Sequence, residues 1–275
     1  MKEQKKKHLF TNRQLAALLI PLALDQLLNS FMGTVDTLIV SNIGSAAISA
    51  VSLVDAINIL VVEAFLALAA GGTVVCSQYL GNKDVEKANK AAGQLVFVTF
   101  FLSLLMAVIC IAFHEPILRA IFGKVEKEVM DNAKIYFLFS AVAFPFIALY
   151  DDGASILRAQ ENSRLPMQIS IIANVLNVVL NLLFVWGFHL GVGGSACATM
   201  LARAFAMAAV LYELRKPKWT VHLKSYFSIR PDWDQIRRIL KIGIPSGIEN
   251  SMFQFGKLAI QSTVSMMGTA AIAAQ

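Results

Sequence analysis

The chain has 275 residues, of which 57% are hydrophobic and only 15% are charged, and its formal net charge is +6. A water-soluble domain carries about 25% charged residues, so this chain has too few charges to cover a surface that faces water. The composition excludes an ordinary soluble enzyme or nucleic-acid-binding domain and indicates a membrane protein.

Seven stretches of the chain are long and apolar enough to cross about 30 Å of hydrocarbon as helices. The expected fold class is therefore all-α, a polytopic membrane helix bundle. Residues 214–241 form the longest polar connection, and Trp233–Lys241 has the pattern of a short amphipathic helix at the membrane surface. In chain order we expect membrane helices over residues 14–41, 46–79, 91–113, 135–157, 165–188, 191–213 and 242–265.

Lysine and arginine are distributed unequally between the connections. Eighteen of them lie in the N-terminal tail and in the connections that follow the second, fourth and sixth stretches, and four lie in the opposite connections. Because basic residues accumulate on the cytoplasmic side of a membrane protein, we expect the N-terminus and the 214–241 linker to be cytoplasmic. The expected location is the plasma membrane, which in a bacterium is the inner cell membrane.

The first and seventh stretches are similar to one another. When residues 20–51 are placed over residues 244–275 without a gap, an offset of 224, ten of the 32 positions are identical. Any two apolar helices share some Ala and Ile by chance. This match also aligns Pro21 with Pro245 and a glycine with a glycine, which favours a true internal repeat.

The repeat predicts how the chain is organised. One copy holds six membrane helices, and because six is even, both copies point the same way, as in many transporters. We therefore expect a six-helix N-terminal lobe over 1–213, a cytoplasmic linker over 214–241, and the first helix of a second lobe over 242–275. The chain would then be an N-terminal fragment of a protein of roughly twice 224 residues.

Polar residues in the first membrane stretch are candidates for function, because ionisable groups inside a membrane are costly. Asp25, Asn29 and Asp36 have the spacing i, i+4, i+11, which places them on one face of a helix. Asp25 is equally well explained as a residue near the lipid headgroups. Asp36 lies deeper and has no basic neighbour in the sequence, so it is the stronger candidate.

The fifth and sixth stretches carry further polar residues. Asn174, Asn177 and Asn181 share one helix face, and such a stripe either lines a cavity or joins helices by hydrogen bonds. Thr199 and Arg203 lie one turn apart in the sixth stretch. Arg203 either pairs with an acid inside the bundle or extends to the membrane surface.

Other intramembrane polar residues have no role that the sequence assigns. In the seventh stretch, Glu249 lies beside a polar stripe that indicates a water-filled cavity, and in the second stretch Asp55 and Glu63 stand alone. Asp151 and Asp152 lie near the cytoplasmic end of the fourth stretch, where we expect solvent to reach them. The members of the stripe beside Glu249 are Asn250, Gln254, Lys257 and Gln261.

The sequence shows no sign of catalytic or cofactor chemistry. Cys76, Cys110 and Cys197 lie in apolar stretches without metal-ligand spacing, so we interpret them as small buried hydrophobic residues. We find no phosphate-binding glycine loop, no His/Cys cluster and no nucleophile–base pair. This argues against an enzyme and against an ATP-driven pump, and we expect no cofactor.

Short motifs occur in a characteristic order, and the order and spacing are more specific than any one motif. They are Met32–Thr37, Gln78–Gly81, Leu157–Ser163, Asn177–Asn181, and Gly191–Ala196 with Thr199. Together with the six-helix repeat they resemble the multidrug and toxic compound extrusion (MATE) family of cation-coupled exporters over the whole chain. The resemblance implies twelve helices in two lobes around a central cavity that opens alternately to each side.

The resemblance also implies roles for individual residues. Family members carry an essential acid in the first helix, which matches Asp36. In one branch a cation site adds residues that match Asn177 and Asn181 on helix five and Thr199 on helix six, but an Asp stands there in place of Asn181. Some members use an acid on helix seven, and Glu249 lies about one turn before that position.

These observations predict a secondary antiporter that exports drugs or organic cations, driven by the entry of Na⁺ or H⁺. Asp36, Asn177, Asn181 and Thr199 would bind the coupling ion and form a candidate Na⁺ site, with Asp25 and Glu249 as further candidates. The expected partners are amphipathic or cationic small molecules and the lipid bilayer. The full-length protein is expected to be monomeric.

Two alternatives stay open at this point. A lipid-linked oligosaccharide flippase of the same superfamily would need a strongly basic central cavity, whereas only Arg203 and Lys257 are basic within the expected membrane helices. An inactive fragment or a non-transporting assembly subunit is the other alternative, because half of the expected cavity wall would be missing from this chain.

Overall fold

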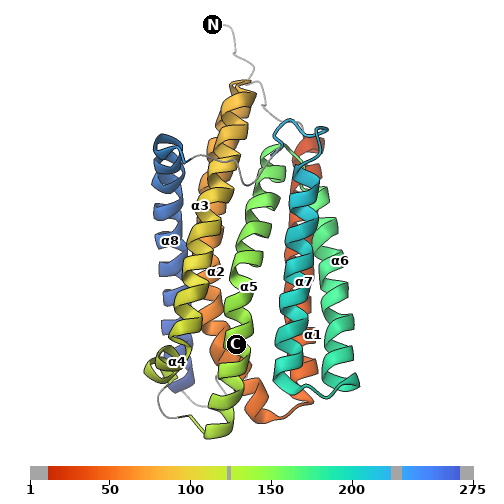
Figure 1. Ribbon diagram of the computed structural model, residues 1–275, viewed down its shortest axis with the longest axis vertical. Coiled ribbons are helices and arrows are strands. Elements are labelled where there is room, and N and C mark those ends of the chain that lie inside the picture. Colours follow the sequence, from red (N-terminus) through yellow and green to blue (C-terminus); the bar gives the residue numbers. More distant parts are fainter. Residues whose placement is uncertain (1–11, 123–124, 224–230, 267–275) are drawn as a thin grey trace, which may run out of the picture.

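A computed structural model describes residues 12–122, 125–223 and 231–266, and within these ranges it describes the side chains of all residues except 12–18, 122 and 255–266. This part of the chain folds into helices and contains no strand. The predicted all-α fold class is confirmed. In chain order the helices are α1 (Asn12–Ser41), α2 (Ser45–Gly81), α3 (Val85–Ala112), α4 (His114–Phe122), α5 (Lys127–Ala159), α6 (Arg164–Asn181), the π-helical η1 (Leu182–Gly187), α7 (Gly191–Leu214) and α8 (Trp233–Met266) (Figure 1).

Within the described residues, five helical stretches are long and apolar enough to cross a membrane, by length and composition. They are α2, α3, α5, the pair α6 and η1, and α7. Helices α1 (30 residues) and α8 (34 residues) are of similar length but are not among these stretches, for which only the described residues count. The expected polytopic membrane bundle is therefore supported by most of its predicted spans.

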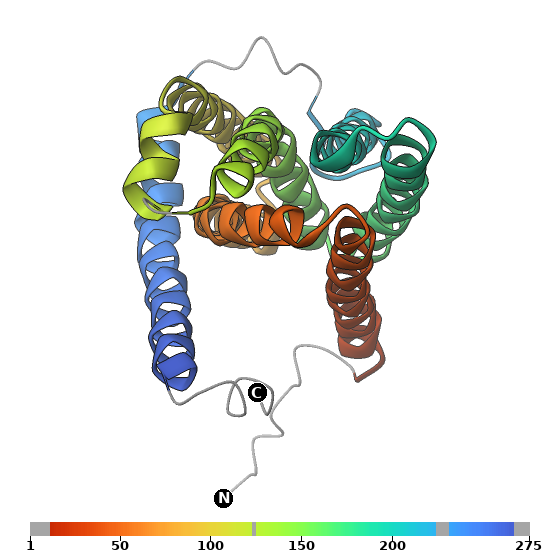
Figure 2. The ribbon, with the colours of Figure 1, turned by 90° about the horizontal axis from the view of Figure 1, so that it is seen from below.

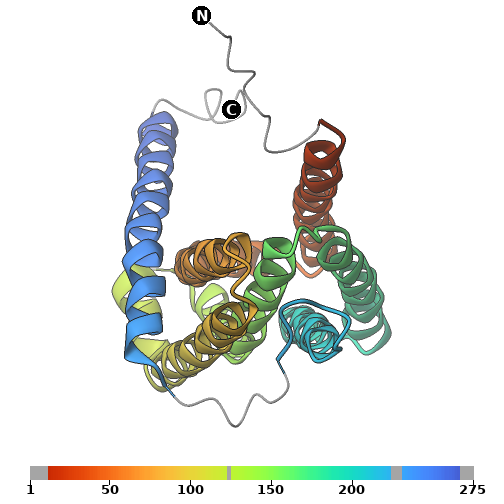
Figure 3. The same cartoon turned by 90° about the horizontal axis from the view of Figure 1, so that it is seen from above.

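Helix α5 lies at the centre of the bundle, where α2, α3 and α7 pack around it (Figure 2). Its buried residues change from Ala and Phe in one half to Leu and Ile in the other, so it contributes to two apolar clusters along its length. Helix α6 packs on α7, and α1 packs mainly on α6. Viewed along the bundle, α1 and α8 tilt away from the other helices toward the same side (Figure 3).

Two elements differ from the prediction. Residues 114–122 form α4, a short helix whose buried Leu118 packs among the residues around α5, and no helix was expected there. The expected short surface helix Trp233–Lys241 is not separate from the seventh membrane helix, because α8 runs without a break from Trp233 to Met266. Pro245 lies inside α8 without ending it, although a proline removes a backbone donor and usually kinks a helix.

Helices α2 and α8 approach each other very closely through glycines. A Cβ atom added to Gly71 would lie 2.6 Å from the carbonyl oxygen of Ile239, and one added to Gly243 would lie 3.0 Å from that of Ala67. Glycine lets two backbones approach in this way, as small residues do between membrane helices. The close contact fixes the first half of α8 against the lobe formed by α1 to α7.

The connections that follow α2, α5 and α7 lie at one end of the bundle (Figure 1). The amide of Gln160, at the end of α5, exchanges two hydrogen bonds with the backbone of Val221. The side chain of Asn89 near the start of α3 accepts a hydrogen bond from the backbone N–H of His222. The basic connections that the sequence assigns to the cytoplasm therefore form one packed end.

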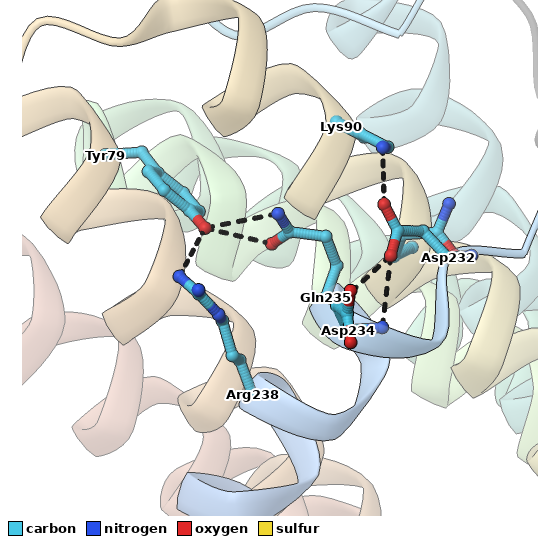
Figure 4. A network of polar contacts seen from close by, with 7 residues as sticks. Tyr79, Lys90, Asp232, Asp234, Gln235 and Arg238 are labelled. Atoms are coloured by element: carbon cyan, nitrogen blue, oxygen red, sulfur yellow. Dashed lines mark hydrogen bonds and ion pairs between the residues drawn. The ribbon is translucent and has the colours of Figure 1, made fainter.

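The start of α8 is also attached at this end by a polar cluster (Figure 4). The hydroxyl of Tyr79, near the end of α2, contacts the amide of Gln235 at 3.1 and 3.2 Å and accepts a hydrogen bond from Arg238 at 2.9 Å. Lys90 of α3 forms an ion pair with Asp232, which precedes α8. We call Tyr79, Lys90, Asp232, Gln235 and Arg238 the linker cluster.

The internal repeat is described only in part. Pro21 lies inside α1 and Pro245 lies inside α8, as the alignment of the two stretches expects. The side chains after residue 254 and the backbone after residue 266 lie outside the described residues, so the later positions of the match, including Gly268, are not tested. The boundaries of the two lobes and of the linker stay predictions.

Candidate functional site

Four polar side chains from three helices form a continuous chain of hydrogen bonds. The Nδ2 atom of Asn181 donates to Oδ1 of Asp36 and to Oδ1 of Asn177, both at 3.1 Å. The Nδ2 atom of Asn177 donates to Oγ1 of Thr199, also at 3.1 Å. These contacts join α1, α6 and α7, and they bring together the four residues that the sequence predicted for one ion site.

The local helical geometry explains how these side chains meet. Asn177 and Asn181 are four residues apart on α6, so both point from the same face into the bundle, and both are buried. The π-helical η1 begins directly after Asn181, and π-helical turns are frequently found at functional sites. Asp36 and Thr199, at the two ends of the chain, are both only partly buried.

The cluster borders a small cavity of about 90 Å³, which Asp36, Asn177, Thr199 and Arg203 help to line. The Oδ1 atom of Asn181 is buried and accepts no hydrogen bond within the described part of the chain. A carboxylate, two amide oxygens and a hydroxyl are hard oxygen ligands of the kind that small cations prefer. The residues present therefore fit a small cation or a proton, with one carboxylate among them.

Asp25 belongs to a second polar chain on the same pair of helices. Its carboxylate lies 3.7 Å from Arg158 of α5 and accepts a hydrogen bond of 3.4 Å from Asn29. Asn29 in turn accepts one of 3.3 Å from Asn174. Asp25 is thus held by a basic residue near one end of the bundle, about three helical turns from Asp36.

Glu249 lies apart from both chains. It is exposed on α8 and lines neither of the two cavities that Arg203 borders. Of the polar stripe on this helix, Gln254 donates a hydrogen bond of 3.2 Å to Glu63 of α2. The side chains of Lys257 and Gln261 lie outside the described residues.

A second, larger cavity of about 340 Å³ lies between α2, α5 and α7. Asn58 donates hydrogen bonds of 3.2 Å to Asp55 and to Ser140, and all three line the cavity together with Arg203. The sequence analysis gave Asp55 no role and missed Asn58 and Ser140. The signal was the i, i+3 spacing of an acid and an amide in an apolar stretch.

The expectation that solvent reaches Asp151 and Asp152 is wrong for Asp152, whereas Asp151 is partly buried. Asp152 is fully buried, and one oxygen of Asp151 and both oxygens of Asp152 lack a hydrogen-bond partner in the described part of the chain. The physical reason is that α5 is the central helix. Near its end it is packed against α2, α3 and α7, and Asp152 lies on a buried part of this helix.

Comparison with known proteins identifies the family. The family model described as MatE matches residues 21–183, which include most of α1 and all of the helices from α2 to α6. The chain belongs to the MatE family. The MATE resemblance seen in the sequence is confirmed, and MATE proteins are transporters rather than enzymes.

Curated relatives include transporters from several bacteria. The chain is 28% identical over 258 residues to the uncharacterized transporter YisQ of Bacillus subtilis, a match that covers 92% of this chain and 56% of the relative. It is 25% identical over 273 residues to the probable multidrug resistance protein NorM of Thermotoga maritima, covering 95% of this chain and 56% of that protein. The chain spans little more than half the length of these relatives.

Solved structures show the same fold. A MOP superfamily transporter from Pyrococcus furiosus superposes with a TM-score of 0.87 at 21% identity, covering 94% of this chain and 57% of that chain. The Vibrio cholerae MATE transporter VcmN in its bent form gives a TM-score of 0.85 at 22% identity, covering 95% of this chain and 59% of that chain. This MatE chain therefore has the architecture of one part of a MATE transporter.

Proposed function

We propose that the complete product of this gene is a cation-coupled antiporter that exports drugs or organic cations, using Na⁺ or H⁺ entry through the lobe described above. The single observation that carries the proposal is the Asp36 cluster. The Asp36 carboxylate accepts a hydrogen bond from the amide of Asn181 inside a membrane bundle, where an ionised group is unfavourable in free energy. Acidic residues in such places mark ion pathways.

Binding of an ion at Asp36 gives a way to couple ion and drug movement. Asp36 lies on α1, while Asn177, Asn181 and Thr199 lie on α6 and α7. An ion that binds more tightly when these helices are close favours one conformation of the lobe over another. The two cavities share Thr199 and Arg203. A shift of these side chains on ion binding would therefore also change the wall of the larger cavity.

The finer features of this function belong to the same proposal. We propose that the packed end with the basic connections faces the cytoplasm, that the protein lies in the inner cell membrane, and that it works as a monomer. The lobe would extend over 1–213 and the linker over 214–241. The flippase alternative is not favoured, because the NorM relative is named as a probable multidrug resistance protein. In addition, Arg203 is the sole basic side chain that lines the two cavities of the described part.

The decisive experiment is dye efflux from cells that produce the complete gene product, with Na⁺ and pH varied separately. We expect wild-type cells to extrude ethidium when one of the two ion gradients is present. Asp36→Asn should abolish this efflux, because the variant lacks the carboxylate charge that binds the cation or the proton. Asp131→Asn, which changes an exposed acid of α5, should leave it unchanged.

Two results would overturn the proposal. One is Asp36→Asn cells that still extrude the dye against a gradient as fast as wild type, at matched protein levels. The other is wild-type efflux that depends on neither Na⁺ nor pH. The 275-residue chain by itself, reconstituted in vesicles, is expected not to transport, because it spans little more than half the length of its relatives.

A further inference from the structure

An apolar groove on the surface of the bundle takes no part in the proposed ion site. It lies between α2, α3 and α8, has a volume of about 590 Å³, and is lined by neither Asp36 nor Arg203. Gly243 and Gly247 of α8 pack closely on Ala67 of α2 and, having no side chain, leave the space that the groove occupies. The larger apolar side chains that line it are Leu68, Leu102, Leu240, Ile244, Ile248 and Met252.

The groove is open to the surroundings and long enough for a hydrocarbon chain. Ile244 and Ile248 on its wall are 54% and 57% exposed. It follows α8 from Leu240 to Met252, a rise of about 18 Å at about 1.5 Å per residue. One leaflet of a bilayer contributes about half of a hydrocarbon core of about 30 Å. The groove therefore matches one acyl chain in length and polarity, with Ser251 as the one polar side chain among its described lining residues.

Basic side chains gather at the end of the groove where Leu240 lies. A second depression borders the groove there, and the two share Leu240 and Ile244. Arg237, Arg238 and Lys241 line this second depression, and all three are exposed. Among the described residues, none of the three forms an ion pair with an N–O distance of 4.0 Å or less. Their charges are therefore available to an anion.

One face of α8 has the order of side chains that a membrane surface requires. Trp233, Arg237 and Lys241 have the spacing i, i+4, i+8, and Ile244 and Ile248 continue the same face. Trp233 is 76% exposed, and tryptophan is enriched where a membrane meets water. The face thus passes from an interfacial tryptophan through basic residues to apolar ones, as a lipid passes from headgroup to acyl chain.

The chemistry of the basic end selects an anionic lipid. The depression carries three basic residues against one acid, Asp234, so its net charge is positive. Basic clusters next to a membrane helix bind anionic headgroups, and a guanidinium group matches phosphate oxygens with two parallel hydrogen bonds. A lipid without net charge offers the same acyl chains but less attraction at this end.

We propose that this groove binds one anionic phospholipid, with the headgroup at Arg237, Arg238 and Lys241 and an acyl chain along α8 from Leu240 to Met252. The lipid is a bound partner and not a transported substrate, because the groove is separate from the two cavities that Arg203 borders. The proposal does not depend on the proposed antiport, since binding is measured without an ion gradient.

Two lipids with identical acyl chains test the proposal. Palmitoyl-oleoyl phosphatidylglycerol is anionic, and palmitoyl-oleoyl phosphatidylcholine has no net charge. Each is titrated into the purified complete gene product in detergent, and native mass spectrometry measures the fraction of protein with lipid bound. We expect wild type to bind the first phosphatidylglycerol at least about tenfold more tightly than phosphatidylcholine, which is what two basic residues beside an anionic headgroup contribute.

A paired substitution tests the headgroup end. Arg237→Gln combined with Lys241→Gln should remove most of the preference for phosphatidylglycerol. Arg238 is left unchanged, because it donates a hydrogen bond to Tyr79 and helps to hold the start of α8 (Figure 4). The control is Arg119→Gln combined with Lys127→Gln, which removes the same charge from exposed positions at the other end of the bundle and should keep the preference (Figure 1).

A further substitution tests the acyl-chain end. Ala64→Phe places a ring at an exposed position of α2 that lines the groove, and it should weaken both lipids by a similar factor. Ala70→Phe, at an exposed position of the same helix outside the groove, should weaken neither. The unfolding midpoints of all variants in lipid-free detergent should match wild type, which separates lost binding from misfolding.

Three results would overturn the proposal. The first is equal affinity of wild type for the two lipids, or a preference that survives in the Arg237 and Lys241 variant. The second is displacement of phosphatidylglycerol by inorganic phosphate, which would show that the basic residues bind a free anion and that the groove adds nothing. The third is wild type that binds neither lipid, which would show that protein covers the groove in the complete molecule.

Discussion

The amide of Asn181 on α6 donates a hydrogen bond to the carboxylate of Asp36 on α1, with an Nδ2–Oδ1 distance of 3.1 Å between residues 145 positions apart. This contact ties the first helix of the lobe to the fifth membrane stretch at the candidate ion site. Because α1 packs mainly on α6, the pair contributes both to ion binding and to the position of α1.

A double-mutant cycle measures this contact. Asp36→Ala and Asn181→Ala in the complete gene product should each lower the midpoint of thermal unfolding in detergent. The stability lost by the double variant should be smaller than the sum of the losses of the two single variants. The expected coupling is about 1 kcal/mol, the usual net contribution of a hydrogen bond. Asn174 on the same helix bonds to Asn29 instead, so a cycle of Asp36→Ala with Asn174→Ala should be additive. Equal coupling in both cycles would contradict a specific contact.

The glycine contact between α2 and α8 should not tolerate a methyl group. In Gly71→Ala the new Cβ would lie 2.6 Å from the carbonyl oxygen of Ile239, so α8 must move. We expect a loss of stability of about 1–3 kcal/mol, the usual cost of overpacking. Gly81→Ala is the matched control, because no atom lies within 4 Å of a Cβ at that position. Similar unfolding midpoints for the two variants would show that α2 and α8 do not pack so closely.

Tyr79 is the centre of the linker cluster. Tyr79→Phe keeps the ring and removes the hydroxyl that contacts Gln235 and Arg238. We expect a loss of about 1 kcal/mol in unfolding free energy and faster proteolysis of the linker by added trypsin. Tyr212→Phe, at an exposed position of α7, should behave as wild type in both measurements. A wild-type digestion rate for Tyr79→Phe would mean that the hydroxyl does not hold the start of α8.

Asp232 should make the linker cluster sensitive to acid. The Lys90 ammonium, followed by hydrogen bonds from the backbone N–H groups of Gln235 and Asp234, lowers the pKa of Asp232 below its ordinary value of 3.8. An acid with a lowered pKa stabilises the fold at pH values above its unfolded pKa, and that contribution is lost as the pH falls through the folded value.

The measurement is the difference in unfolding midpoint between wild type and Asp232→Asn as the pH is lowered from 7. The variant keeps an oxygen that can cap the start of α8 but loses the charge that pairs with Lys90. We expect wild type to be more stable at pH 7 and the difference to shrink below pH 3.8. A difference that stays constant over this range would show that the ion pair adds nothing.

The membrane helices could be predicted from apolar runs alone, because each must satisfy its own backbone in a lipid environment. Helix α4 was missed because a nine-residue amphipathic helix leaves no long apolar run. The continuity of Trp233–Lys241 with the seventh membrane helix was missed for a related reason. The charged residues up to Lys241 end the apolar pattern, but none of them ends a helix, and α8 continues through Pro245.

The candidate site was predictable only along single helices. Spacing placed Asn177 and Asn181 on one face of α6, but it gave no information on which helix would face them. The partners Asp36 and Thr199 came from the family resemblance instead. The contact of Asn58 with Ser140 spans 82 positions and has no local signal, and the burial of Asp152 depends on helices that are distant in the sequence.

The unbroken course of α8 has a mechanical consequence. At 1.5 Å per residue its 34 residues extend about 51 Å. One end is clamped to α2 by the tyrosine hydroxyl and the glycine contact, while the far end tilts away from the bundle (Figure 3). A stiff helix of this length acts as a lever, so a small rotation at the clamped end becomes a displacement of several ångströms at its far end.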